Sequence, residues 1–200
     1  MPDPIEFYFD FSSPYAYLAA EQIEDIAARY GRTVVWRPVL LGVVFKITGM
    51  QPGPVIPMRG AYMLRDAPRF ARLLGLPFRI PSTFPVASTV PSRAAYWVEA
   101  QDPGRSGPLC RALLRGYFVD DRDPTTPEAL AKAADEVGLD GQALLAGTQD
   151  QAVKDRLRAE TDGAIARGVF GSPFTFVDGE GFWGADRLSQ VELWLQGKGR

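Results

Sequence analysis

Histidine is absent from the 200-residue sequence, and cysteine occurs only once, at Cys110. Without histidine the chain cannot form a Ser-His-Asp triad, a Cys-His dyad or an HExxH zinc site. A single cysteine allows neither an intrachain disulfide nor a CxxC redox pair, and its Ala- and Leu-rich surroundings indicate a small buried side chain. Any chemistry must therefore proceed without imidazole, and we expect no metal site.

The chain also lacks an excess of charge and a long apolar run. Lysine and arginine number 22 and aspartate and glutamate 24, so the formal net charge is −2. No basic excess is available to neutralise phosphates, which argues against nucleic acid as a partner. The longest apolar runs, around 39–45, are far shorter than the roughly 20 residues of a membrane span. The acidic start does not resemble a signal peptide, so we expect a soluble, cytoplasmic protein with no membrane partner.

The first forty residues carry the pattern of a strand, a helix and a second strand. Apolar and polar residues alternate over 5–11, which is typical of a strand. Ser13 stands where a helix N-cap belongs and Pro14 at the first helical position, so a helix is predicted over 14–30. A second strand is predicted over 34–39. This unit implies a parallel pair of strands with a right-handed crossover.

The middle of the chain changes to a helical period after three closely spaced prolines. Thr148 and Gln151 have the spacing of a capping box for a long helix that ends near Gly168. Before that helix, the pattern predicts helices over 58–74, 92–99, 109–119, 127–137 and 142–146.

The end of the chain returns to strands. An Asp-Gly turn separates predicted strands over 174–177 and 181–183, which form a hairpin. Asp186 is expected to cap a last helix that extends to about residue 196. The order βαβ, a helical block and then αββα predicts an α/β, thioredoxin-like fold with a large all-helical insertion.

The same order divides the chain into two domains. Residues 1–50 and 148–200 are assigned to the thioredoxin-like domain. Residues 51–147 are assigned to the inserted helical domain. Neither part contains a fixed-period repeat, so a solenoid is not expected.

Three junctions could carry chemistry, and each has an ordinary alternative. The Ser13 hydroxyl could donate to an anion held at the helix N-terminus, or it could only cap that helix. A cis bond before Pro173 would leave the backbone of Ser172 free to pair with an extended peptide, although X–Pro bonds are usually trans. The Asp186 carboxylate could meet an ammonium group, or it could serve as a plain cap.

A basic set could bind an anionic group. Three of its arginines share one helix face, which is usually a solvated face, and Asp66 is near enough to pair with part of it. Alternatively, one or two of these cations hold an anionic substrate, a role that suits the planar guanidinium group. The set consists of Lys46, Arg59, Arg65, Arg69 and Arg72.

Several spaced motifs resemble one enzyme family. They are FYFDFxSPYxYL at 7–18, LLGxVFKxTG at 40–49, YMxRD at 62–66, GVFGxP at 168–173 and FWGxDRL at 182–188. Together they resemble the 2-hydroxychromene-2-carboxylate isomerases, relatives of the kappa-class glutathione transferases within the DsbA-like thioredoxin superfamily. The likeness is collinear over essentially the whole chain.

This resemblance implies a homodimeric, glutathione-dependent isomerase of aromatic catabolism. It implies that Ser13 hydrogen-bonds the glutathione sulfur, that Ser172 before a cis Pro173 pairs with the cysteinyl backbone, and that Asp186 binds the γ-glutamyl end. Three further glutathione-binding positions differ in type from the family, which has asparagine, lysine and a polar residue there. In this chain they are Met50, Arg59 and Ala185.

The implied reaction is reversible thiol addition to a chromene carboxylate, followed by ring opening, rotation and elimination to a trans-o-hydroxybenzylidenepyruvate. Lys46 or Arg59 would hold the substrate carboxylate. The redox relatives carry cysteines where this chain has Ser13 and Ala16, so disulfide exchange is unavailable. Two alternatives remain open: a kappa-class-like transferase that conjugates electrophiles at the same site, and a non-catalytic thioredoxin-like module that binds peptides.

Overall fold

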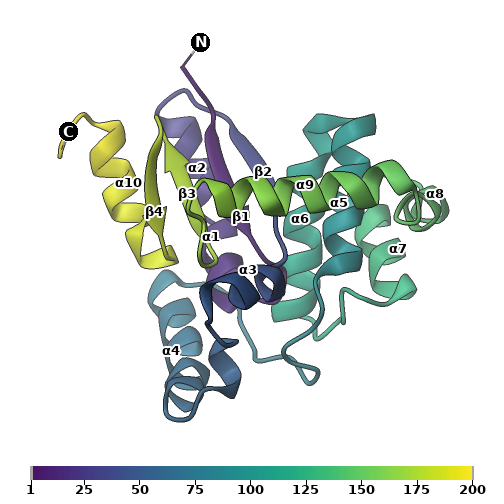
Figure 1. The fold of residues 1–200 in the computed structure, drawn as a ribbon, viewed down its shortest axis with the longest axis horizontal. Coiled ribbons are helices and arrows are strands. Elements are labelled where there is room, and N and C mark those ends of the chain that lie inside the picture. The colour runs from purple at the N-terminus through teal and green to yellow at the C-terminus, as the bar shows by residue number, and fades with distance from the viewer. Residues whose placement is uncertain (1, 200) are drawn as a thin grey trace.

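A four-stranded sheet with strand order β2-β1-β3-β4 lies at the centre of the computed structural model, which describes residues 2–199 (Figure 1). β1 (Ile5–Phe9) runs parallel to β2 (Val34–Pro38) and antiparallel to β3 (Phe174–Val177). β3 in turn pairs antiparallel with β4 (Glu180–Trp183). The predicted parallel pair, the hairpin and the thioredoxin-like α/β fold are confirmed.

The first connection contains two short helices, α1 (Pro14–Ala20) and α2 (Ile23–Arg29), where one helix over 14–30 was predicted. The break falls at Gln22, whose φ of −121° is not helical. Ile23, the first residue of α2, is fully buried. A continuous apolar period does not reveal such a break, because both helices present apolar residues to the same core.

The middle of the chain is helical, as predicted, but two of its helices begin earlier than the apolar pattern suggests. Pro103 stands at the first position of one helix, and the Asp102 side chain accepts a hydrogen bond from the Gly104 N–H as its N-cap. The predicted pattern also missed the first helix of this region, α3. The helices are α3 (Leu41–Thr48), α4 (Arg59–Leu74), α5 (Thr89–Gln101), α6 (Pro103–Phe118), α7 (Pro127–Glu136) and α8 (Gly141–Gly147), with a 3-10 turn η1 (Gly53–Val55).

The long helix α9 (Gln151–Ala166) follows, and its predicted capping box is wrong. Asp150 occupies the N-cap position, without a side-chain cap hydrogen bond. The Thr148 hydroxyl instead donates to the Leu145 carbonyl at 2.7 Å, because Thr148 ends α8. The chain closes with a 3-10 turn η2 (Ala185–Arg187) and α10 (Leu188–Leu195).

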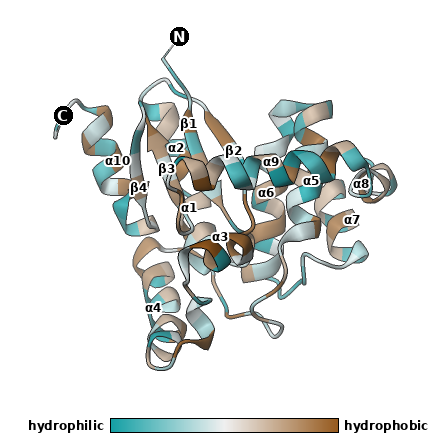
Figure 2. Ribbon diagram, viewed as in Figure 1, coloured by the Kyte–Doolittle hydropathy of each residue, from teal (hydrophilic) through white to brown (hydrophobic). Residues whose placement is uncertain are grey.

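Helices cover both faces of the sheet, and the alternation along β1 assigns its side chains to them. Phe7 and Phe9 lie in a core with α1, α2 and α6, where Leu109 and Leu114 are fully buried. Tyr8 lies in a second cluster with Phe174 and Phe176 of β3 and with Ala164 of α9, which crosses the opposite face (Figure 1). The larger core continues from the sheet into the helical block, and the two-domain division stays a prediction. Figure 2 shows hydrophobic stretches on the strands and on helices such as α3.

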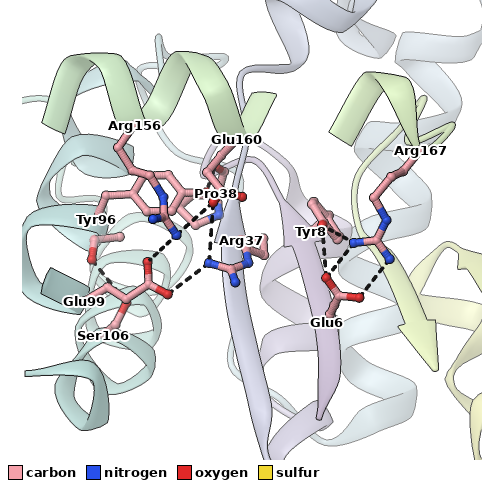
Figure 3. A network of polar contacts seen from close by, with 11 residues as sticks. Glu6, Tyr8, Arg37, Pro38, Tyr96, Glu99, Ser106, Arg156, Glu160 and Arg167 are labelled. Atoms are coloured by element: carbon pink, nitrogen blue, oxygen red, sulfur yellow. Dashed lines mark hydrogen bonds and ion pairs between the residues drawn. The ribbon is translucent and has the colours of Figure 1, made fainter. Parts of the chain in front are cut away.

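Charged pairs attach α9 to its neighbours (Figure 3). Near its carboxyl end, Arg167 pairs with Glu6 of β1 at 2.6 Å and donates to the Tyr8 hydroxyl at 2.7 Å. Near its middle, Glu160 approaches Arg37 of β2 at 3.8 Å and Arg156 at 2.8 Å. These side chains line a groove of about 440 Å³ whose cations are already paired.

Candidate active site

Ser13 lies at the turn between β1 and α1 and makes two hydrogen bonds with its hydroxyl. Its Oγ accepts from the Ala16 N–H at 3.2 Å, so the predicted cap is confirmed. The same hydroxyl donates to the main-chain carbonyl of Ser172 at 3.1 Å, across 159 positions of sequence. Because α1 ends at Ala20, fewer peptide dipoles align on Ser13 than a helix to residue 30 would supply.

The loop before β3 presents Ser172 to this turn. The peptide bond between Ser172 and Pro173 is cis, as the resemblance implied; a second cis bond, before Pro85, was not predicted. The Ser172 Oγ accepts from the main-chain N–H of Asp10 at 2.9 Å. Within residues 2–199, the Ser172 N–H donates no hydrogen bond. That N–H is therefore available to an extended ligand, and the carbonyl has a second lone pair.

Asp186 lies in η2, and its predicted role as a helix cap is wrong. The chain makes a 3-10 turn at this point, so α10 begins after Arg187, and neither element receives a side-chain cap. The Asp186 carboxylate is 61% exposed and meets Arg187 at 3.5 Å. The Gly184 N–H donates to the Pro173 carbonyl at 2.9 Å, which holds the start of η2 against the cis-proline loop. The carboxylate is thus accessible from solvent, with Arg187 as its ion-pair partner.

Gly184 has a conformation that only glycine adopts readily. Its φ is +114°, and a Cβ at this position would lie 2.4 Å from Oδ1 of Asp186. A glycine here therefore lets the carboxylate fold back toward the turn. Ala185, predicted as a glutathione contact, is buried and offers no polar side chain.

The remaining predicted contacts lie on the α3–α4 stretch. Lys46 is exposed on α3, Arg59 is exposed at the first turn of α4, and Met50 is half-buried between them. Within residues 2–199, neither cation forms an ion pair with a carboxylate, and no hydrogen bond joins either one to Ser13. Both remain open to an anionic group.

A second polar link joins α1 to α4. The Tyr15 hydroxyl donates to Asp66 at 2.7 Å, and Tyr62 donates to the same carboxylate at 3.1 Å. Arg69 pairs with it as well, so the predicted partial pairing of the basic face is confirmed. Burial alone would raise the pKa of Asp66, but the hydrogen bonds from Tyr15 and Arg69 lower it below its ordinary value. Asp66 therefore stays charged and holds α4 beside Ser13.

Asp10, for which the sequence predicted no role, is bonded to several segments of this region. Asp10 is 4% exposed, and its carboxyl group accepts hydrogen bonds from the Ser12 N–H at 2.8 Å, the Leu41 N–H at 2.9 Å and the Ser88 hydroxyl. Burial raises the pKa of the Asp10 carboxyl, and these three donors oppose that rise. The one feature of the sequence that could have indicated this role is an acidic residue between Phe9 and Phe11, at the end of a strand predicted to be buried.

Other features of the described residues do not form this site. The groove beside Trp36, about 430 Å³, and the one along α9 are lined by neither Ser13 nor Ser172. Cys110 is fully buried, and desolvation raises the pKa of its thiol well above the usual range. Between residues 2 and 199 no cluster of three acidic or cysteine side chains could hold a metal ion. No helix in that range is long and apolar enough to cross a membrane.

Comparison with known proteins gives a family match over nearly the whole chain. The model of the DSBA-like thioredoxin domain matches residues 4–196. A 2-hydroxychromene-2-carboxylate isomerase from Sphingobium xenophagum is 33% identical over 98% of this chain and 99% of its own length. Glutathione S-transferase kappa 1 from Rattus norvegicus is 28% identical over 97% of this chain and 91% of its own length.

The fold agrees with the sequence comparison. A solved structure of a 2-hydroxychromene-2-carboxylate isomerase superposes with a TM-score of 0.84 at 26% identity. The match covers 96% of this chain and 94% of that one. The two proteins therefore share the DsbA-like thioredoxin fold over nearly their whole length.

Proposed function

The chain belongs to the DSBA-like thioredoxin domain family, with isomerases and kappa-class glutathione transferases as full-length relatives, and from that premise we propose a glutathione-dependent isomerase. Its substrates are 2-hydroxychromene-2-carboxylate-type compounds, converted reversibly to trans-o-hydroxybenzylidenepyruvates. The observation that carries the proposal is the 3.1 Å contact between the Ser13 hydroxyl and the carbonyl of the cis-proline loop. We also propose that the protein is a cytoplasmic homodimer.

The residues around this contact fit a tripeptide thiol. The free N–H and the carbonyl of Ser172 suit the main chain of an extended peptide. The exposed Asp186 carboxylate, which caps no helix, suits an ammonium group such as that of a γ-glutamyl residue. Bound glutathione would supply the thiolate that adds to and leaves the conjugated substrate.

Ser13 supplies the hydrogen bond that favours the thiolate. Its hydroxyl carries one hydrogen, which it donates to the Ser172 carbonyl, so it cannot donate to a sulfur atom at the same time. When a ligand N–H occupies that carbonyl, the Ser13 hydroxyl can turn toward the sulfur while its oxygen still accepts from Ala16. Without histidine in the chain, this donor and the nearby N–H groups replace a general base.

The substrate carboxylate needs a cation, and Lys46 and Arg59 are the candidates. Both are exposed and form no ion pair within the described chain. α3 begins where the Leu41 N–H bonds Asp10, and Lys46 lies five residues further along, about 7.5 Å along the helix axis. Because the start of α3 is bonded to the strand end that leads into Ser13, we propose Lys46 as the first candidate to bind the substrate carboxylate.

The test compares wild-type protein with Ser13→Ala in a glutathione-dependent isomerisation assay. A hydrogen bond to a charged group is worth about 1.5–3 kcal/mol, so kcat is expected to fall about 10- to 150-fold. Thr126→Ala is the matched control, because Thr126 caps α7 with a bond to Ala129 at 3.3 Å, away from the site. Both variants lose about 1 kcal/mol of stability. Equal turnover in Ser13→Ala and wild type would refute the assignment.

A kappa-class-like transferase is the second candidate, favoured by the 28% identity to the rat kappa enzyme. It would use the same glutathione site but release a conjugate instead of free thiol. Product analysis separates the two, since an isomerase leaves the glutathione concentration unchanged and a transferase consumes it. A non-catalytic peptide-binding module predicts no stabilisation by glutathione, whereas an excess of 100 times Kd should add about 2.7 kcal/mol.

A further inference from the structure

Asp10 connects the loops of the proposed site through every polar group it has. Its main-chain N–H donates to the Ser172 Oγ at 2.9 Å, and its main-chain carbonyl accepts from the Ser13 N–H at 3.0 Å. Its Oδ1 accepts from the Ser12 N–H, and its Oδ2 accepts from the Leu41 N–H at the start of α3. One residue thus contacts the Ser13 turn, the cis-proline loop and the helix that carries Lys46.

The carboxyl group of Asp10 is buried without a cation. Within the described part of the chain, no lysine or arginine pairs with it. On α6, burial and then the charges of nearby acids, Asp10 among them, raise the pKa of Tyr117, whose hydroxyl donates to the Thr83 carbonyl. A buried carboxyl group costs stability unless donors surround it, and here the donors are two main-chain N–H groups and the Ser88 hydroxyl.

We propose that Asp10 is a positioning residue that holds Ser13, Ser172 and the start of α3 in one arrangement. The proposal rests on the proposed function, because it concerns how the glutathione and substrate groups meet. The polar groups of Asp10 are all engaged within the chain, so it acts through its neighbours. It acts through the Ser12 turn, which sets the direction of the Ser13 hydroxyl, and through α3, which carries Lys46.

Asp10→Asn separates positioning from charge. The amide keeps the size of the carboxyl group but has a donor in place of one acceptor, and that donor must face the N–H of Ser12 or Leu41. Two donors then oppose each other, so one of the two backbone contacts is lost. Ser88→Ala is the matched control, because it removes the Ser88 bonds to this carboxyl group and to the Ser12 N–H but leaves both Asp10 oxygens as acceptors for the Ser12 and Leu41 N–H groups.

The first measurement needs no glutathione. In a Ser13→Cys background the thiol at position 13 reports the environment of the α1 N-terminus through the pH dependence of its alkylation by iodoacetamide. Cys110 is fully buried and does not interfere. A cysteine at a helix N-terminus has a pKa below 8.5, and loss of positioning by Asp10→Asn should raise it by about one unit, which lowers the thiolate fraction about tenfold. Ser88→Ala should shift it by less than about 0.3 unit.

The direction in which the pKa of the thiol at position 13 shifts distinguishes a positioning role of Asp10 from a purely electrostatic one. If Asp10 acted only as a nearby negative charge, Asp10→Asn would favour the thiolate and lower this pKa. A lowered or unchanged pKa refutes the positioning role, and so does an equal rise in Ser88→Ala. If Asp10→Asn does not fold, Ser172→Ala replaces it. That variant removes the acceptor of the Asp10 N–H while keeping the carboxyl group, and a raised pKa is again expected.

The second measurement uses the native Ser13. Asp10→Asn should lower kcat of the glutathione-dependent reaction about tenfold and change KM for glutathione by less than about threefold, because the substitution alters only the side chain and keeps the main-chain bond from Asp10 to the Ser172 Oγ. A loss that follows the unfolded fraction, seen by circular dichroism, would show a structural role only. If wild-type protein neither binds glutathione nor turns over substrate, the proposed function fails, while the thiol pKa still tests Asp10.

Discussion

Asp186→Asn tests whether this carboxylate serves glutathione or the fold. The side chain caps no helix, and its carboxylate is 61% exposed beside Arg187 at 3.5 Å. Such an exposed pair contributes between zero and about 1 kcal/mol. The change should therefore alter the free energy of unfolding without ligand by less than about 0.5 kcal/mol, and the Tm by less than about 2 °C.

The effect on glutathione binding should be much larger. An ammonium group that donates to a carboxylate forms a charge-assisted hydrogen bond, which is about twice as strong as one between neutral groups. Loss of the charge should lower affinity by about 1–3 kcal/mol, which corresponds to about 5- to 150-fold in Kd. The difference between the two proteins should shrink at high salt, because the carboxylate is exposed and its field is screened.

Titration calorimetry with glutathione measures this affinity directly. Glu180→Gln is the matched control, since Glu180 is an exposed acid on the same hairpin, at the opposite end of β4 from Gly184. It should bind glutathione as wild type does. An unchanged Kd in Asp186→Asn would refute the assignment of this residue to the γ-glutamyl end, and a clearly lowered Tm without ligand would show that its role is structural.

Four further outcomes are expected. Arg167→Gln should lower the free energy of unfolding in urea by about 1 kcal/mol at pH 7. The hydrogen bond from Arg167 lowers the pKa of the Glu6 carboxyl, so this stabilisation is present above pH 4.5 and is lost as the pH falls through the lowered pKa. A destabilisation by Arg167→Gln that grows in acid would contradict this reasoning. Cys110 should react with a thiol reagent only in denaturant, and modification of the folded protein would show that it is accessible. Gly184→Ala should weaken glutathione binding and lower the Tm, because a Cβ would strain the φ of +114° and displace the carboxylate of Asp186. Light scattering at micromolar concentration should give the mass of a dimer, and a monomer mass would exclude the proposed assembly.

Local pattern alone was enough to predict the architecture. The alternation before Ser13, the helical period of the middle and the Asp-Gly turn near the end identify elements by contacts between neighbours in sequence. The cap at Ser13 and the burial of Cys110 were predictable for the same reason. The junctions before β3 and α10 already marked Ser172 and Asp186 as candidates beside ordinary alternatives, and the family motifs then proposed a part of glutathione for each.

Long-range contacts decided the rest, because hydrogen bonding and burial depend on which segments meet. The break at Gln22, the 3-10 turn that frees Asp186 from capping and the link from Ser13 to Ser172 all follow from packing against distant elements. Asp10 shows most clearly what the sequence alone cannot predict. In the sequence it is one acid between two phenylalanines; in the fold its polar groups meet donors and acceptors from positions as distant as Ser172, and that convergence exists only after the sheet and its helices have packed.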